Sequence, residues 1–196
     1  ADYDEAIRID PNFALAHNNR GDVRRVKGEI DRAMQDFSTA INLDPKLAIA
    51  YGNRGYLYFR QRKYDMAIAD YNEEIKLRPN VLAYINRGNA HRALEHLDEA
   101  LADYAEVIRI DRPDARGWRN RGLIHLYKED FKSGIADYDQ ALRYDPGDAF
   151  SWNNRGQAKL RLGDRDGAIA DFRKALQLSP NNPTIRASLQ KLGVTP

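Results

Sequence analysis

The tripeptide Asn19-Arg20-Gly21 returns four more times along the chain, as Asn53-Arg54-Gly55, Asn86-Arg87-Gly88, Asn120-Arg121-Gly122 and Asn154-Arg155-Gly156. Successive copies stand 33 or 34 residues apart. Such regular spacing indicates tandem copies of one supersecondary unit. When a 34-residue repeat is counted from Ala14, the glycines hold position 8. The expected repeats then cover 14–47, 48–80, 81–114, 115–148 and 149–182.

Each repeat is expected to fold as two helices. Position 20 is small and position 24 is aromatic in every copy, and residues four apart share one face of a helix. The small residues are Ala33, Ala67, Ala100, Gly134 and Ala168, and the aromatic residues are Phe37, Tyr71, Tyr104, Tyr138 and Phe172. Proline at position 32 ends the second helix because it has no amide hydrogen. It occurs as Pro45, Pro79, Pro146 and Pro180.

On these residues the chain resembles the tetratricopeptide repeat (TPR) family, whose unit has an aromatic at position 4, small residues at 8 and 20, an aromatic at 24 and proline at 32. Position 4 here holds His17, Tyr51, Tyr84, Trp118 and Trp152. The resemblance implies an all-α fold, a right-handed α-solenoid or superhelix of stacked helical hairpins. The abundant Asn-Arg-Gly resembles bacterial members of the family.

The two ends of the chain differ from the full repeats. Residues 1–13 align with the second helix of a preceding repeat, and we expect a fragment or processed form whose upstream repeats are missing. Residues 183–196 are expected to form a capping helix and tail. Asn182-Pro183 can start this helix, and Ile185, Leu189 and Leu192 form one apolar stripe on it. A polar outer face on such a helix keeps a solenoid soluble.

Position 7 is arginine and position 23 is aspartate in every repeat. We expect these residues to pair and to stabilise the stack, because a group present in every unit more often serves stacking than binding. The alternative is a row of binding arginines. Asparagine at position 6 has two interpretations. It caps neighbouring backbone, or, as the family resemblance implies, it hydrogen-bonds a peptide in the groove.

The resemblance also implies that positions 2, 5, 9, 12 and 13 of the first helices line a concave groove. Six arginines and one acid, Asp22, occupy these positions. Arginine suits carboxylates and aromatic residues supply apolar anchors, which indicates a groove for an extended, acidic and partly hydrophobic segment. The alternative is that these side chains only solvate the groove and pack. Arg116 and Arg119 are the favoured pair. The candidate peptide-binding residues are Arg25, Asn53, Tyr56, Phe59, Arg60, Asn86, Asn89, Arg92, Arg116, Arg119, Asn120, Tyr127, Phe150, Asn154 and Arg161.

Other kinds of site find little support. The carboxylate clamp of chaperone-binding relatives is not matched, because Ile85, Phe150 and Asn154 stand where cations are required. The chain has no cysteine, which excludes thiolate metal sites and a cysteine nucleophile. His91 and His125 share position 11 of successive repeats and are expected to be too far apart to hold one metal. Serines lie in no nucleophile motif. We expect no catalytic residues, no metal site and no cofactor.

These observations predict a non-enzymatic scaffold for protein–protein interaction that binds a protein or peptide partner. Self-assembly into a dimer or oligomer through the exposed N-terminal half repeat is the alternative. The net charge is only +2, from 31 basic and 29 acidic residues, so nucleic acid is not an expected partner. No apolar stretch reaches the length that a bilayer requires, so membrane insertion is not expected. We expect a cytoplasmic location, with the periplasm as the alternative.

Overall fold

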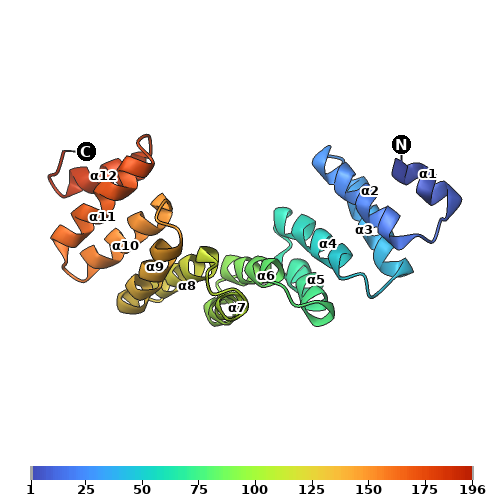
Figure 1. Cartoon of the computed structure of the whole chain (residues 1–196), viewed down its shortest axis with the longest axis horizontal. Coiled ribbons are helices and arrows are strands. Elements are labelled where there is room, and N and C mark those ends of the chain that lie inside the picture. The colour runs from blue at the N-terminus through green and yellow to red at the C-terminus, as the bar shows by residue number, and fades with distance from the viewer. Residues whose placement is uncertain (1, 196) are drawn as a thin grey trace. The chain divides into compact units, whose positions relative to one another are not determined.

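The computed structural model describes residues 2–195. Within this range the chain forms twelve helices and no strand. The first six are α1 (Asp2–Ile9), α2 (Ala14–Val26), α3 (Ile30–Leu43), α4 (Ala48–Arg60), α5 (Tyr64–Leu77) and α6 (Val81–Ala93). The others are α7 (Leu97–Ile110), α8 (Ala115–Tyr127), α9 (Phe131–Tyr144), α10 (Ala149–Arg161), α11 (Arg165–Leu178) and α12 (Pro183–Lys191). The fold is an all-α solenoid of helical hairpins (Figure 1). Ala1 and Pro196, which belong to the expected segments 1–13 and 183–196, lie outside the described residues.

The helices fall into two compact units, one ending at His96 and the other beginning at Leu97. The first unit contains α1 to α6 and the second contains α7 to α12, so the division falls inside the expected repeat 81–114. Within each unit, helices that follow one another pack together. In the first unit α2 packs on α3 and α4 on α5, and in the second α8 packs on α9 and α10 on α11 (Figure 1).

The residues that define the repeat lie where the two helices of a hairpin meet. The aromatic side chain at position 24 is almost fully buried in all five copies: Phe37, Tyr71, Tyr104, Tyr138 and Phe172. In four of these repeats it lies against the glycine at position 8: Gly21, Gly55, Gly122 and Gly156. A Cβ atom on Gly21 would stand 2.8 Å from the Phe37 ring, and one on Gly156 would stand 2.9 Å from the Phe172 ring. These glycines therefore allow close approach of the two helices, which a side chain at this position would prevent.

The turn between the two helices of a repeat uses the same backbone conformation each time. Gly28 and Gly163, at position 15, have φ of 81° and 87°, so they follow the first helix in the left-handed region. Arg62, Glu95 and Glu129 hold the same position in the other repeats with φ of 61°, 61° and 57°. The turn thus keeps its shape even where the residue is not glycine.

The two ends of the chain are covered to different extents. At the C-terminal end, Asn182 accepts hydrogen bonds from the amides of Thr184 and Ile185 and so caps α12. Ile185 and Leu189 are buried against Phe172 and Ala175, with Leu192 packed beside them, as the expected capping helix requires. At the other end, Tyr3 takes the place of the repeat aromatic on α1 but remains 39% exposed.

Candidate functional site

Four of the five arginines at position 7 pair with aspartates inside the protein. Arg20, Arg54, Arg121 and Arg155 each donate two hydrogen bonds, from Nε and Nη2, to the position-23 aspartate of the same repeat, at 2.7 to 3.1 Å. The partners are Asp36, Asp70, Asp137 and Asp171, all of them buried. These hydrogen bonds raise the pKa of the Arg54 and Arg121 guanidinium groups above the usual value. The predicted Arg–Asp pairing is confirmed in these four repeats, and these guanidinium groups are engaged within the protein.

The aromatic residue at position 4 completes the same structural unit. The Arg121 guanidinium lies 5.1 Å from the centre of the Trp118 ring, and that of Arg155 lies 4.6 Å from the Trp152 ring. The indole nitrogens of Trp118 and Trp152 donate to the carbonyls of Arg112 and Pro146, six residues earlier in the chain, at 2.9 Å. In these two repeats the position-4 indole therefore ties the repeat to the end of the preceding one, and its ring packs on the position-7 arginine.

The position-6 asparagines are used in more than one way. Asn154 is buried and donates to the Phe150 carbonyl at 2.8 Å, which fits the local backbone interpretation. Asn53 donates to the Asn18 side chain at 3.0 Å, and Asn18 in turn donates to Asn19. These amides bind other groups of the chain. Asn86 and Asn89 on α6 and Asn120 on α8 are half-buried.

In the second unit, the candidate arginines lie beside acids that the count of groove positions did not include. Arg116 donates to Asp114 at 2.6 Å, and this contact lowers the pKa of the Asp114 carboxyl. Arg119 lies 3.6 Å from Asp148, and Arg161 lies 3.1 Å from Glu129. Two aromatic candidates, Tyr127 and Phe150, are exposed. This surface therefore carries paired charges instead of the excess of positive charge that the sequence count suggested.

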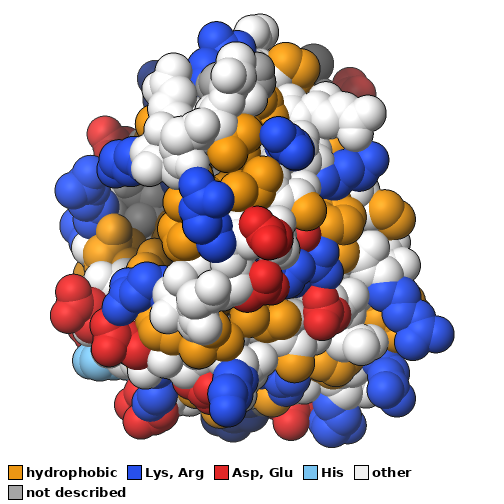
Figure 2. Space-filling view, turned by 90° about the vertical axis from the view of Figure 1, so that its left-hand side faces the viewer, with side chains coloured by type: hydrophobic (Ala, Val, Ile, Leu, Met, Phe, Trp, Pro, Cys, Tyr) orange, Lys and Arg blue, Asp and Glu red, His pale blue; other side chains and the backbone are white. Residues whose placement is uncertain are grey.

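The outer surface of the second unit also shows mixed charge. Figure 2 looks onto the end of this unit that carries α11 and α12, where lysine and arginine side chains are interspersed with acidic and apolar groups. No broad area of one sign is visible on this face. A surface of such mixed charge does not favour one orientation of a long charged partner.

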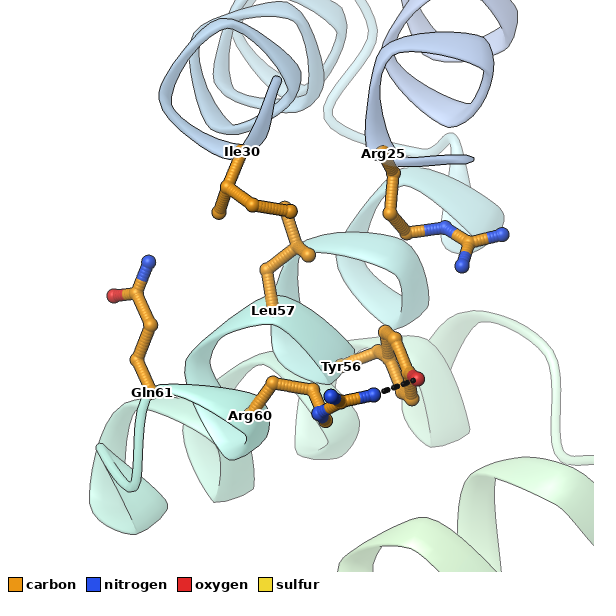
Figure 3. Close-up of a pocket in the computed structure, with 6 residues that line it drawn as sticks. All are labelled: Arg25, Ile30, Tyr56, Leu57, Arg60 and Gln61. Atoms are coloured by element: carbon orange, nitrogen blue, oxygen red, sulfur yellow. Dashed lines mark hydrogen bonds between the residues drawn. The ribbon is translucent and has the colours of Figure 1, made fainter. Parts of the chain in front are cut away.

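In the first unit, three of the candidates come together around a hollow of about 350 Å³. Arg25 comes from α2, and Tyr56 and Arg60 from α4 (Figure 3). The Arg60 Nη1 atom donates to the Tyr56 hydroxyl at 3.0 Å, and the guanidinium groups of Arg25 and Arg60 lie 5.5 and 5.9 Å from the centre of the Tyr56 ring. We call this hollow the Arg60 pocket; its lining residues are Arg25, Ile30, Tyr56, Leu57, Arg60 and Gln61.

The charges of the Arg60 pocket are unequally satisfied. Arg25 forms an ion pair with Asp22 at 2.7 Å. Arg60 has the neutral Tyr56 hydroxyl as its hydrogen-bond acceptor, and among residues 2–195 no carboxylate lies within ion-pair distance of it. Two further candidates of this unit lie outside the pocket. The Phe59 ring packs against the Tyr64 ring, with 5.4 Å between the ring centres, and Arg92 lies on the last turn of α6. The pocket therefore offers one guanidinium without a carboxylate partner beside an apolar floor.

Four family models match the chain, and all describe the same repeat. Two named tetratricopeptide repeat match residues 48–81 and 81–114, another of that name matches 119–183, and one named TPR repeat matches 21–62. The chain belongs to the tetratricopeptide repeat family. No curated protein sequence matches the chain significantly.

Solved structures of other proteins share this fold. YrrB, described as a TPR protein with an unusual peptide-binding site, superposes with a TM-score of 0.83 at 19% identity, over 97% of this chain and 98% of YrrB. MamA from Desulfovibrio magneticus gives 0.79 at 20% identity, over 87% of this chain and 97% of that one. PilF of Pseudomonas aeruginosa gives 0.83 at 19% identity, over 96% and 86%. At these identities the likeness establishes the fold.

Two other kinds of feature, a metal site and a membrane-spanning helix, are absent from the described part of this TPR chain. Among residues 2–195 no three histidine or acidic side chains are grouped so that they could hold a metal ion. Within the same range, none of the helices combines the length and apolar character needed to cross a bilayer.

Sequence reasoning on the TPR pattern missed half of the pocket lining. Ile30, Leu57 and Gln61 stand at positions 17, 10 and 14, outside the set that the family places in the groove. Ile30 and Leu57 were recognisable as apolar residues of the hairpin, and both pack around Ala33 and Phe37. That they also form the floor of a hollow depends on the spacing of α2, α3 and α4, which the pattern does not encode.

Proposed function

We propose that this chain is a non-enzymatic scaffold that binds a partner protein through an extended segment with acidic and apolar side chains. The Arg60 pocket is the observation that carries the proposal. It joins a guanidinium without a carboxylate partner, a second guanidinium and the Tyr56 ring to an apolar floor formed by Ile30 and Leu57. A carboxylate beside an apolar side chain complements this arrangement.

The fold supports binding as opposed to catalysis. A hairpin whose helices are fixed by glycine–aromatic packing and by buried Arg–Asp pairs loses little conformational freedom when a partner binds, so more of the contact energy appears as affinity. The peptide-binding site of the related YrrB fold is consistent with this use. The favoured residues shift from Arg116 and Arg119, which lie beside Asp114 and Asp148, to Arg60.

The test is fluorescence anisotropy with a labelled peptide that carries one Asp among Leu and Ala, compared with the same peptide carrying Asn. We expect wild-type protein to prefer the Asp peptide, and Arg60→Gln to weaken its binding about fivefold. Affinity should fall as salt is added, because the contact is charged and partly exposed. Arg78→Gln, which removes an exposed arginine of the same unit, serves as the matched control. Equal binding of the two peptides, or no effect of Arg60→Gln, would contradict the proposal.

A second candidate function is self-association through α1. On α1, Ile9 is 72% exposed, and Tyr3 is exposed although the equivalent aromatic is buried in every full repeat. Phe13, directly before α2, is 45% exposed. An apolar helix face of this kind is suited to a second copy of the chain. Light scattering over a concentration series distinguishes the two functions, since a mass that stays monomeric at all concentrations rules out self-association.

A further inference from the structure

One carboxylate stands where the other repeats have a packed apolar side chain. Position 27 lies on the second helix and is fully buried as Ala40, Val107, Ala141 and Ala175. In the second repeat the same position is Glu74. A charged group at a packing position is unfavourable unless it is solvated or paired, so its surroundings need an explanation.

The Glu74 side chain turns toward α4 and fills the space that Gly52 leaves open. A Cβ atom on Gly52 would lie 2.5 Å from Glu74 Oε2 and 2.7 Å from its Cδ. Gly52 stands at position 5, one of the groove positions, where the other repeats carry the side chains of Asn18, Ile85, Arg119 and Asn153. The Glu74 carboxylate therefore takes the place of a groove side chain, although it comes from a second helix.

This carboxylate has a fixed position and no cationic partner. The Asn80 amide donates to Glu74 Oε1 at 3.1 Å, and Asn80 is held in turn because its own oxygen caps α6 at the Ala83 amide, at 2.9 Å. Among residues 2–195 no lysine, arginine or histidine forms an ion pair with Glu74. Burial raises the pKa of the Glu74 carboxyl, and the hydrogen bond from Asn80 opposes this effect.

A purely structural role does not require the charge. The amide oxygen of a glutamine at position 74 could accept the same hydrogen bond from Asn80, with a smaller desolvation penalty. What glutamate adds is an anionic oxygen, Oε2, that lies against Gly52 and forms no ion pair within residues 2–195. Such an oxygen is suited to a cation that comes from a ligand.

Glu74 and the Arg60 pocket lie along one face of α4. Gly52, Tyr56 and Arg60 are spaced by four residues and so line one side of the helix. The Glu74 carboxylate lies against Gly52, and Tyr56 and Arg60 line the Arg60 pocket. Eight helical residues correspond to about 12 Å. The surface is therefore negative at one end of α4 and positive at the other.

We propose that this face of α4 selects a peptide segment with two opposite charges: an acidic side chain in the Arg60 pocket and a lysine or arginine that pairs with Glu74. An extended chain rises about 3.3 Å per residue, so the two charged residues of the guest stand about four positions apart. The proposal rests on the proposed function and adds to it the basic residue, its spacing and its partner.

The experiment measures anisotropy with three labelled peptides of Leu and Ala: one with Asp and Lys four positions apart, one with Asp and Lys adjacent, and one in which Gln replaces Lys. We expect wild-type protein to bind the first about fivefold more tightly than the other two. Glu74→Gln should abolish this difference and leave the Asp/Gln peptide's affinity unchanged. Glu73→Gln, which removes the neighbouring acid that pairs with Lys76, should preserve the difference.

The outcomes separate the two proposals. If all three peptides bind equally, or if Glu74→Gln keeps the preference for the four-residue spacing, the role of Glu74 is refuted and the acidic-segment function stands. The proposed function fails if the peptides do not bind wild-type protein, or if Arg60→Gln leaves their affinity unchanged. The inference then fails with it. Thermal unfolding of Glu74→Gln, with the wild-type melting temperature as reference, verifies that the variant is folded.

Discussion

The Arg–Asp pairs show how a repeated residue can be charged, buried and structural at once. Asp137 is buried on α9 and accepts two hydrogen bonds from Arg121, at 2.7 and 2.8 Å. Its removal leaves a half-buried guanidinium without its partner, and losses of this kind are larger than the loss of an exposed ion pair. We expect Asp137→Ala to lower the free energy of unfolding by about 3 kcal/mol, measured by urea denaturation.

Asp139, two residues along the same helix, provides the matched control. It also pairs with an arginine, Arg155, but its side chain is 51% exposed. Solvent screens such a pair, so Asp139→Ala is expected to lower stability by less than about 1 kcal/mol. Equal losses for the two variants would show that burial of the aspartate is not the deciding factor.

The left-handed residue between the helices of a repeat gives a second prediction. Arg62 has φ of 61°, where the side chain of a non-glycine residue is strained, while the equivalent Gly28 and Gly163 are not. Arg62→Gly should raise the free energy of unfolding by about 0.5 to 1 kcal/mol, because the relief of strain exceeds the entropy that glycine adds to the unfolded chain. Gly163→Ala should have the opposite sign. Thermal unfolding measures the stability of both variants. A lower melting temperature for Arg62→Gly than for the wild type would contradict the interpretation that the backbone at Arg62 is strained.

Individual contacts were predictable only where both partners repeat. Arginine at position 7 and aspartate at position 23 recur together, so the sequence shows the pair before the structure does. The partners of the groove arginines lie outside the positions that were counted. Asp114 and Asp148 both hold position 34, where each caps the following first helix, and Glu129 holds position 15. They lie beside Arg116, Arg119 and Arg161, so a count of groove positions alone overestimated the positive charge.

At the scale of helices, the residues at which helices begin and end could be predicted from residue chemistry. Pro45, Pro79, Pro146 and Pro180 all come two residues after a helix ends, and Asp164 caps α11 by accepting from the Gly167 amide. The turns at Arg62, Glu95 and Glu129 were not readable from residue type, because none of the three favours a positive φ. They follow from the repeat itself, since the hairpin geometry around position 15 overrides the local preference.

The candidate site was harder to predict than the helices that form it. Tyr56 and Arg60 share one side of α4, as their spacing of four residues predicts, and the family resemblance named both as groove residues. The contribution of Glu74 was not visible, because it depends on a side chain of one helix filling the gap left by a glycine of another. Spacing within a helix is encoded locally, whereas the reach of a side chain between helices is a property of packing.

At the scale of the whole molecule, stability should be distributed along the chain. Helix contacts in each unit join neighbours in sequence or equivalent helices of adjacent repeats, as in α3 with α4 and α9 with α10. Such nearest-neighbour packing makes stability approximately a sum of repeat and interface contributions. A destabilised terminal helix should therefore affect its neighbours first and leave remote helices unchanged.

Leu189→Ala tests this distribution at the C-terminal end. Leu189 is 0% exposed and packs with Phe172, Ala175 and Ile185, so the substitution leaves a cavity that lowers local stability by about 3 kcal/mol. Hydrogen exchange should accelerate at the amides of α11 and α12, which lose their packing, while the amides of α2 to α5 keep their wild-type rates. Equal acceleration in both groups would mean that the repeats unfold as one cooperative body, because a defect confined to the last helix can reach the first hairpins only if all interfaces open together.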